Sequence, residues 1–128
     1  MKVIIANVGG YPLSSNELQK KLVTFLSSLG LPSNILVEIA VISESDMVTL
    51  GKMYLHEKGS RAHNVLSFVE TEVLEFVQPP DKLKHLGTVA VCFPVAENEA
   101  RLSGILVDEK VYELAKHGIL HLIGQHHH

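Results

Sequence analysis

The spacing of apolar residues changes several times along this chain of 128 residues, and each change predicts a new element. Residues 2–8 form a short apolar run before a pair of glycines, which indicates a strand and then a turn. A helix is predicted to begin where Ser14 and Glu17 have the spacing of a capping box, and to end at Gly30 and Pro32. Its apolar side chains fall on one face: Leu18, Leu22, Phe25, Leu26 and Leu29.

The middle of the chain continues this alternation of strand and helix patterns. Residues 35–42 are apolar almost throughout, which predicts a strand buried on both faces of a sheet. A second helix is predicted from Ser43 to about Glu57. The stripe that this helix turns toward the core is expected to contain Met47, Leu50 and Tyr54.

The second half of the chain is predicted to hold two more strands and two more helical segments. The strands are expected at residues 64–69 and 85–93, with a short helix or turn near residues 95–102. A long last helix is predicted from Asp108 to about Ile123, where the following glycine ends it.

Strands and helices therefore alternate over most of the length, which predicts an α/β (α+β) fold. We expect one domain over residues 1–128, with a mixed four-stranded sheet packed by helices and a metal site on the C-terminal helix. A chain of this length can bury a single core. The order in which the strands pair does not follow from the pattern.

The composition, with 46% hydrophobic and 20% charged residues, is typical of a globular protein. No apolar run approaches the ~20 residues that cross a bilayer, and the apolar start is too brief for a signal peptide. We therefore expect a cytoplasmic protein without a membrane partner. Cys92 is the one cysteine, so an internal disulfide is excluded and any metal site needs other ligands.

The net charge of −3 gives no overall attraction for nucleic acid, so RNA binding needs a local basic surface, and DNA is not an expected partner. Such a surface can be formed by four residues, which as ordinary loop charges would only be solvated: Lys58, Arg61, Lys82 and Lys84. His63 and His85 are expected at the surface.

The histidines are unevenly distributed, with four of the eight in the last eight residues. His117 and His121 are four residues apart on the last predicted helix, so their imidazoles project from one face in consecutive turns. That spacing suits two nitrogen ligands of one zinc ion. If Gly124 lets the chain leave the helix in a left-handed conformation, His127 can fold back as a third ligand. Three protein ligands leave a fourth position for water, as in catalytic zinc sites.

Two alternatives to this metal site stay open. A pair of histidines at this spacing is often incidental, and the last three histidines, residues 126–128, have the composition of a purification tag. In the second case His127 is an imitation of a natural third ligand, or the natural ligand is missing.

The stretch from His117 to His127 resembles the signature of the YbeY family, H-G-x-L-H-L-x-G-Y-D-H, with its three histidines at His117, His121 and His127. Gln125 and His126 replace the tyrosine and aspartate of that signature. Two upstream segments also resemble family motifs. Residues 64–68 resemble the last five positions of P-T-[DN]-V-L-S-F, with Ala62 and His63 in place of the proline and threonine. Residues 86–91 resemble L-G-D-I-x-I, with Thr88 in place of the aspartate.

The resemblance implies a zinc-dependent endoribonuclease that cleaves single-stranded RNA and matures ribosomal RNA, with the ribosome as a partner and a role in ribosome quality control. Family members carry an arginine after the tyrosine that corresponds to Tyr54, whereas Leu55 follows it here. Arg61 lies in the next loop and is the candidate for stabilising phosphate charge, with a solvated loop arginine as the alternative. Ser67 is a second candidate, either as a cleft hydroxyl that bonds substrate or a ligand histidine, or as an ordinary strand serine.

The chemistry expected of such a site is zinc-assisted hydrolysis of an RNA phosphodiester. Zinc proteases use a glutamate directly after the first histidine, and Gly118 occupies that place here, which argues against a peptidase. A different class remains open because several family positions are replaced: a ribosome-associated or RNA-associated binding protein with a structural zinc site and little catalytic activity.

Overall fold

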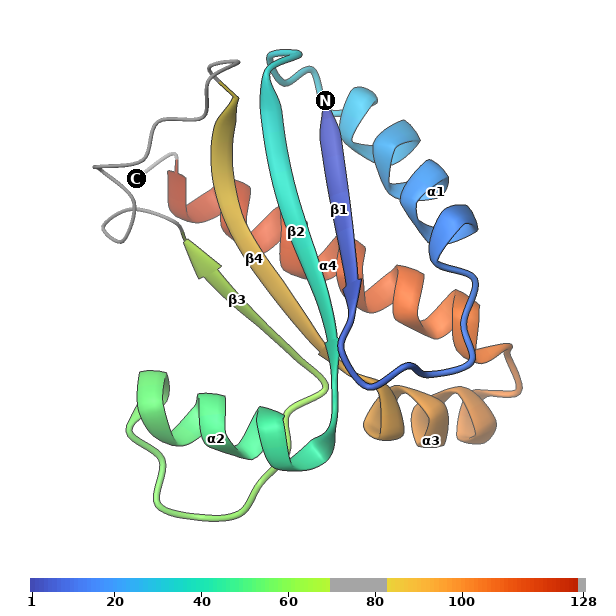
Figure 1. Ribbon diagram of the computed structural model, residues 1–128, viewed down its shortest axis with the longest axis vertical. Helices are drawn as coiled ribbons and strands as arrows, with labels where there is room; N and C mark the ends of the chain where they lie inside the picture. Colours follow the sequence, from blue (N-terminus) through green and yellow to red (C-terminus); the bar gives the residue numbers. More distant parts are fainter. Residues whose placement is uncertain (70–82, 127–128) are drawn as a thin grey trace.

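The computed structural model describes residues 1–69 and 83–126, and within that part of the chain the strands form one four-stranded sheet (Figure 1). The strands, in their order across the sheet, are β1 (Lys2–Asn7), β2 (Ile35–Ile42), β4 (Lys84–Cys92) and β3 (Val65–Val69). The first three run parallel, and β3 pairs antiparallel with β4 at the end of this row. The predicted mixed four-stranded sheet is confirmed, and among the described residues β3 lies at one edge of it and β1 at the other.

The helices cover both faces of this sheet. They are α1 (Ser15–Ser27), α2 (Glu44–Leu55), α3 (Phe93–Ser103) and α4 (Val107–His126). The buried residues of α1 and α4 share one core with one face of the sheet, and α4 crosses behind the strands in Figure 1. A smaller core lies under α2 on the other face. The predicted α/β (α+β) class is therefore confirmed.

The alternation of side chains along β2 explains the two cores. Ile35, Val37, Ile39 and Val41 point to the α1 and α4 side and are buried almost completely. On the opposite side, Ile42 is buried beneath α2, but the residues before it are only half-buried. The predicted burial on both faces is thus complete only where a helix covers the strand.

The start of α1 differs from the predicted capping box in its hydrogen bonds. Ser14 is the N-cap residue, as expected, but its side chain makes no capping hydrogen bond. Its backbone N–H donates instead to Oδ2 of Asp108, at 3.2 Å, and this is the N–H that Glu17 would have capped. The hydrogen bond to Asp108 of α4 therefore replaces the local bond that Glu17 would have made. The N-cap of α2 is a local one, because Ser43 Oγ accepts from the Asp46 N–H at 3.2 Å.

The inner stripe of α2 is shorter than predicted. Met47 is fully buried and Leu50 packs at the edge of the smaller core, but Tyr54 is 57% exposed, so its assignment to the core is wrong. The reason is the width of the sheet. The end of α2 reaches Phe68 on β3, and among the described residues no further strand lies beyond β3 to cover the tyrosine.

The last two helices are both longer than predicted. The short helix or turn is a helix of 11 residues, and Pro94 sits in its first turn, where the missing N–H costs nothing. The last helix continues through Gly124 to His126, so its predicted end is wrong. A single glycine costs a helix only about 1 kcal/mol, and Gly124 does not have the positive φ of a helix-ending glycine.

Candidate active site

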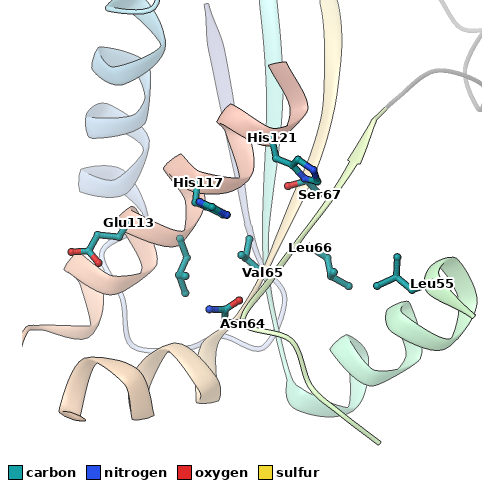
Figure 2. Close-up of a pocket in the computed structure, with 9 residues that line it drawn as sticks. Leu55, Asn64, Val65, Leu66, Ser67, Glu113, His117 and His121 are labelled. Atoms are coloured by element: carbon teal, nitrogen blue, oxygen red, sulfur yellow. The ribbon is translucent and has the colours of Figure 1, made fainter. Parts of the chain in front are cut away.

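A cavity of about 580 Å³ lies along the edge of the sheet, between α4 and β3 (Figure 2). The end of α2 closes it on the far side of β3, through Leu55. Because β3 is the edge strand of the described sheet, its side chains on both faces reach this space. Its lining residues are Leu55, Asn64, Val65, Leu66, Ser67, Glu113, Leu114, His117 and His121.

His117 and His121 project into this cavity from consecutive turns of α4 (Figure 2). The helix is held against the sheet by a stripe of fully buried side chains: Val111, Ala115, Ile119 and Leu122. The two histidines stand beside that stripe and are exposed to solvent. Helical spacing therefore placed both correctly at the wall of a cleft.

Gly118, between the two histidines, allows α4 to approach the sheet closely. A Cβ atom at this position would lie 2.4 Å from Cγ1 of Val89, which is closer than Cβ atoms come to other carbons, and 3.0 Å from Oγ of Ser67, which is a tight contact. Ser67 Oγ donates a hydrogen bond of 3.0 Å to the backbone carbonyl of Gly118. The Ser67 hydroxyl lines the cavity as predicted, but its proton is directed to the α4 backbone rather than to a histidine.

Two polar residues of the cavity were given no role on the basis of the sequence. Asn64 is held by the Glu99 carboxylate of α3, to which its Nδ2 donates at 3.3 Å. Glu113 stands one turn before His117 and pairs with Lys110 at 3.4 Å. The motif at residues 64–68 was the available signal for Asn64, whereas Glu113 has a helical spacing of four from His117.

Cations are missing from the wall of this cavity, as far as the described residues form it. Leu55 lines it at the position where the family motif carries arginine. Arg61 is exposed in the loop between α2 and β3, three residues before Asn64, and is not a lining residue. The proposed role of Arg61 thus remains a prediction, which rests on the reach of a long side chain from this loop.

The other candidate basic residues and histidines are not among the described residues that line the cavity. Lys58 and Lys84 are exposed, and Lys82 lies outside the described residues. His63 was expected at the surface, but it is half-buried, with Nε2 at 2.8 Å from Oε2 of Glu57. His63 is less exposed than expected because the loop between α2 and β3 folds back and brings its imidazole against the carboxylate of Glu57. His85 is half-buried as well.

The described residues do not bring three possible metal ligands together, counting histidine, cysteine, aspartate and glutamate. His127, the predicted third ligand, lies outside residues 1–69 and 83–126, so the three-histidine site stays a prediction. The two placed histidines fit the requirements of a pair of zinc ligands. They come from one helix face, and they open into a solvent-accessible cavity rather than into the core.

Within the described ranges, no helix has the length and apolar character needed to span a membrane.

Comparison with known proteins gives a consistent result. Residues 11–128 match the model of the family described as Endoribonuclease YbeY. The Endoribonuclease YbeY of Geobacter metallireducens is 32% identical over 130 residues, which cover 99% of this chain and 81% of that protein. The corresponding protein of Thermobifida fusca is 27% identical over 138 residues, with the same coverage of 99% and 81%.

A shorter match reaches higher identity. The Endoribonuclease YbeY of Dehalococcoides mccartyi is 43% identical over 54 residues, which are 42% of this chain and only 34% of that protein. The solution structure of a Thermotoga maritima protein superposes with a TM-score of 0.57 at 23% identity, over 94% of this chain and 71% of that one, and supports the fold alone. The family indicated by the sequence motifs is confirmed.

Proposed function

This chain belongs to the endoribonuclease YbeY family, and from that premise we propose that it cleaves phosphodiester bonds of single-stranded RNA in the cavity between α4 and β3. Endoribonucleases are hydrolases that cut RNA internally. The observation that supports this place of cleavage is the projection of His117 and His121 into one cavity, whose other wall is the edge strand (Figure 2).

The residues that would hold a metal ion are His117, His121 and, from the end of the chain, His127. We propose zinc, because a set of neutral imidazoles is a common donor set for this ion. When bound, zinc supplies Lewis acidity for phosphodiester hydrolysis at neutral pH. The binding and orientation of the RNA must come from the residues of the chain itself.

The surrounding residues have positioning roles in this proposal. The Ser67 hydrogen bond to Gly118 fixes the turn of α4 that separates the two histidines. Asn64 presents an amide to the cavity while Glu99 restrains its rotation, so it can orient a phosphate or ribose hydroxyl. Arg61, in the loop that leads to Asn64, is proposed to contact the phosphate charge of the RNA.

The cellular role follows from the family rather than from the geometry. We propose processing of ribosomal RNA, association with the ribosome, a part in ribosome quality control and a place in the cytoplasm. The first of these roles requires that the chain recognises an unpaired segment of ribosomal RNA.

The proposal is tested with protein that carries no added tag, measuring zinc content and the cleavage of a fluorescent single-stranded RNA. His117→Ala and His121→Ala are each expected to lose both zinc and cleavage. Leu120→Ala is the matched control, because this side chain lies on the same helix, is 50% exposed and does not line the cavity. Equal cleavage by the wild type and both histidine variants would contradict the proposal.

One observation favours a second candidate function, the binding of RNA or ribosomes without turnover. The cavity has no lysine or arginine among its described lining residues, and Leu55 stands where the motif has arginine. Charge stabilisation in the transition state is then weaker than in a typical nuclease. Co-sedimentation with ribosomes, combined with intact RNA after long incubation with zinc-loaded protein, would establish this alternative.

A further inference from the structure

The end of α2 carries an unusual run of exposed apolar side chains. Met53, Tyr54 and Leu55 are exposed by 61%, 57% and 47%. Tyr54 is the one aromatic residue among the exposed large hydrophobic side chains of the described chain. Apolar surface of this kind next to a cavity is typical of a binding site rather than of an ordinary solvated helix.

The tyrosine is placed by an aromatic contact with the edge strand. Its ring centroid lies 4.9 Å from that of Phe68, with an angle of 55° between the ring planes. Phe68 directly follows Ser67, and the neighbouring Leu55 and Leu66 both line the cavity. In Figure 2 the side chains of these two leucines face each other on the side of β3 away from the histidines. The Tyr54–Phe68 pair thus extends the cavity wall outward.

The charged residues that are near Tyr54 in the sequence are mostly positive. Lys52, Lys58 and Arg61 are all exposed, although the chain as a whole has a net charge of −3. The nearest acid in the sequence, Glu57, is half-buried and bound to His63, whose Nε2 lies 2.8 Å from its Oε2. The Glu57 carboxylate therefore interacts with the His63 imidazole, whereas Lys52, Lys58 and Arg61 are exposed to solvent.

Gly51 makes the contact between Glu57 and His63 possible. A Cβ atom on Gly51 would lie within 2.3 Å of Oε1 of Glu57, so a larger residue would displace the carboxylate. With glycine there, the loop closes behind α2 and holds the segment that carries Lys58 and Arg61. Lys58 and Arg61 therefore lie exposed in the loop that directly follows the end of α2.

We propose that Tyr54 stacks against an unpaired nucleobase of the bound RNA, while Lys58 and Arg61 contact the phosphates on either side of that nucleotide. The inference rests on the proposed function and specifies a nucleotide subsite next to the cavity. An exposed aromatic ring offers a base a stacking face, and exposed cations in the adjoining loop offer the neighbouring phosphates opposite charges. Bases within a duplex have both faces covered, so the subsite selects single-stranded RNA.

The test is the affinity of the full chain for a fluorescent single-stranded RNA, measured by anisotropy under conditions that do not require cleavage. Tyr54→Ala is expected to weaken binding by about 5- to 100-fold, the range for loss of one stacked base. Tyr54→Phe is expected to retain binding. Tyr54→Leu keeps apolar bulk against Phe68, so it is expected to stay folded. It is nevertheless expected to bind RNA as weakly as Tyr54→Ala, which shows that the loss of affinity comes from the missing ring and not from unfolding. Leu102→Ala is the control and is expected to bind normally, because this apolar side chain is 80% exposed on α3, outside the run at the end of α2.

The phosphate contacts are tested by the salt dependence of the same binding. Lys58→Ala and Arg61→Ala are each expected to reduce the slope of log affinity against log salt by about 0.7, the value for one phosphate contact on a single strand. An unchanged slope in both variants would overturn this part of the inference.

The outcomes separate this inference from the proposed function. If the wild type cleaves single-stranded RNA and Tyr54→Ala binds that RNA within twofold of the wild-type affinity, the stacking site is refuted while the nuclease proposal stands. The stacking site is also refuted if duplex RNA is bound as tightly as single-stranded RNA and is equally sensitive to Tyr54→Ala, because the bases of a duplex have no free face to stack on the ring. A wild type that binds RNA without cutting it refutes the nuclease alone, and one that does neither refutes both.

Discussion

Ser67 and Gly118 are 51 positions apart in the chain, and the serine hydroxyl donates a hydrogen bond of 3.0 Å to the glycine carbonyl. This bond links the edge strand β3 to the turn of α4 that lies between His117 and His121. Gly118 makes it possible because it has no Cβ to collide with Val89 or with the serine itself. The position of the histidine pair relative to the opposite wall therefore depends on this contact.

Replacing Ser67 with alanine is expected to lower the free energy of unfolding by about 0.5–1.5 kcal/mol, the usual net value of one hydrogen bond. The Gly118 carbonyl then loses a partner beside a partly buried strand. Urea unfolding followed by circular dichroism measures the change. Ser103→Ala, at the exposed end of α3, is the control and is expected to alter stability by less than about 0.5 kcal/mol. A Ser67→Ala protein as stable as the wild type would show that the bond contributes nothing.

Two glycines of α4 are expected to respond to alanine in opposite directions. Gly118→Ala is expected to destabilise the protein by about 1–3 kcal/mol, because the new methyl group meets Val89 in a packed core. Gly124→Ala is expected to stabilise it by about 0.4–1 kcal/mol, because its Cβ enters open space and alanine favours a helix.

Thermal unfolding of both alanine variants checks this pair of expectations. A loss of stability in Gly124→Ala would mean that this glycine needs a left-handed conformation after all. An unchanged Gly118→Ala protein would mean that α4 does not press against the sheet as closely as the distances require.

Cys92 is expected to make the stability of the protein depend on pH in alkaline solution. Burial raises the pKa of this thiol above its ordinary value of 9.0, a hydrogen bond with the Val95 backbone opposes that rise, and Glu44 adds to it. Since the folded state holds the neutral thiol, the unfolded state loses a proton first as the pH rises past about 9. Stability is therefore full below pH 9 and falls above it.

Denaturant unfolding between pH 7 and pH 11, compared with a Cys92→Ala protein, measures this effect. The wild type is expected to lose more stability than the variant as the pH rises, and parallel curves would contradict the expectation. The buried thiol is also expected to react with a thiol reagent only after unfolding.

Several features of the fold could be read from the sequence because they depend on local pattern. The strand at residues 35–42 and the buried stripe of α4 each follow from regular spacing of apolar residues. The exposure of Tyr54 could not, since it depends on where the sheet ends beneath α2. The contact of Asp108 with the Ser14 N–H likewise comes from the packing of two helices that are far apart in the sequence.

The candidate site was predictable in part for the same reason. His117 and His121 could be predicted to line one wall because side chains four residues apart on a helix project from the same face. The partner of Ser67 could not be, because only the assembled sheet shows that its hydroxyl meets a backbone carbonyl. The pairing of Glu57 with His63 was hidden because it requires the loop to fold back over Gly51.

The histidine pair of α4 is proposed as the centre of RNA cleavage, and one measurement tests this most directly. It is the single-turnover rate at which tag-free protein cuts a single-stranded RNA at saturating zinc, for the wild type, His117→Ala, His121→Ala and Leu120→Ala. Loss of either histidine is expected to slow cleavage by about 100-fold or more, beyond the 10–100-fold typical of residues that only support a metal ligand, with Leu120→Ala unaffected. Histidine variants that cut within twofold of the wild-type rate would contradict it.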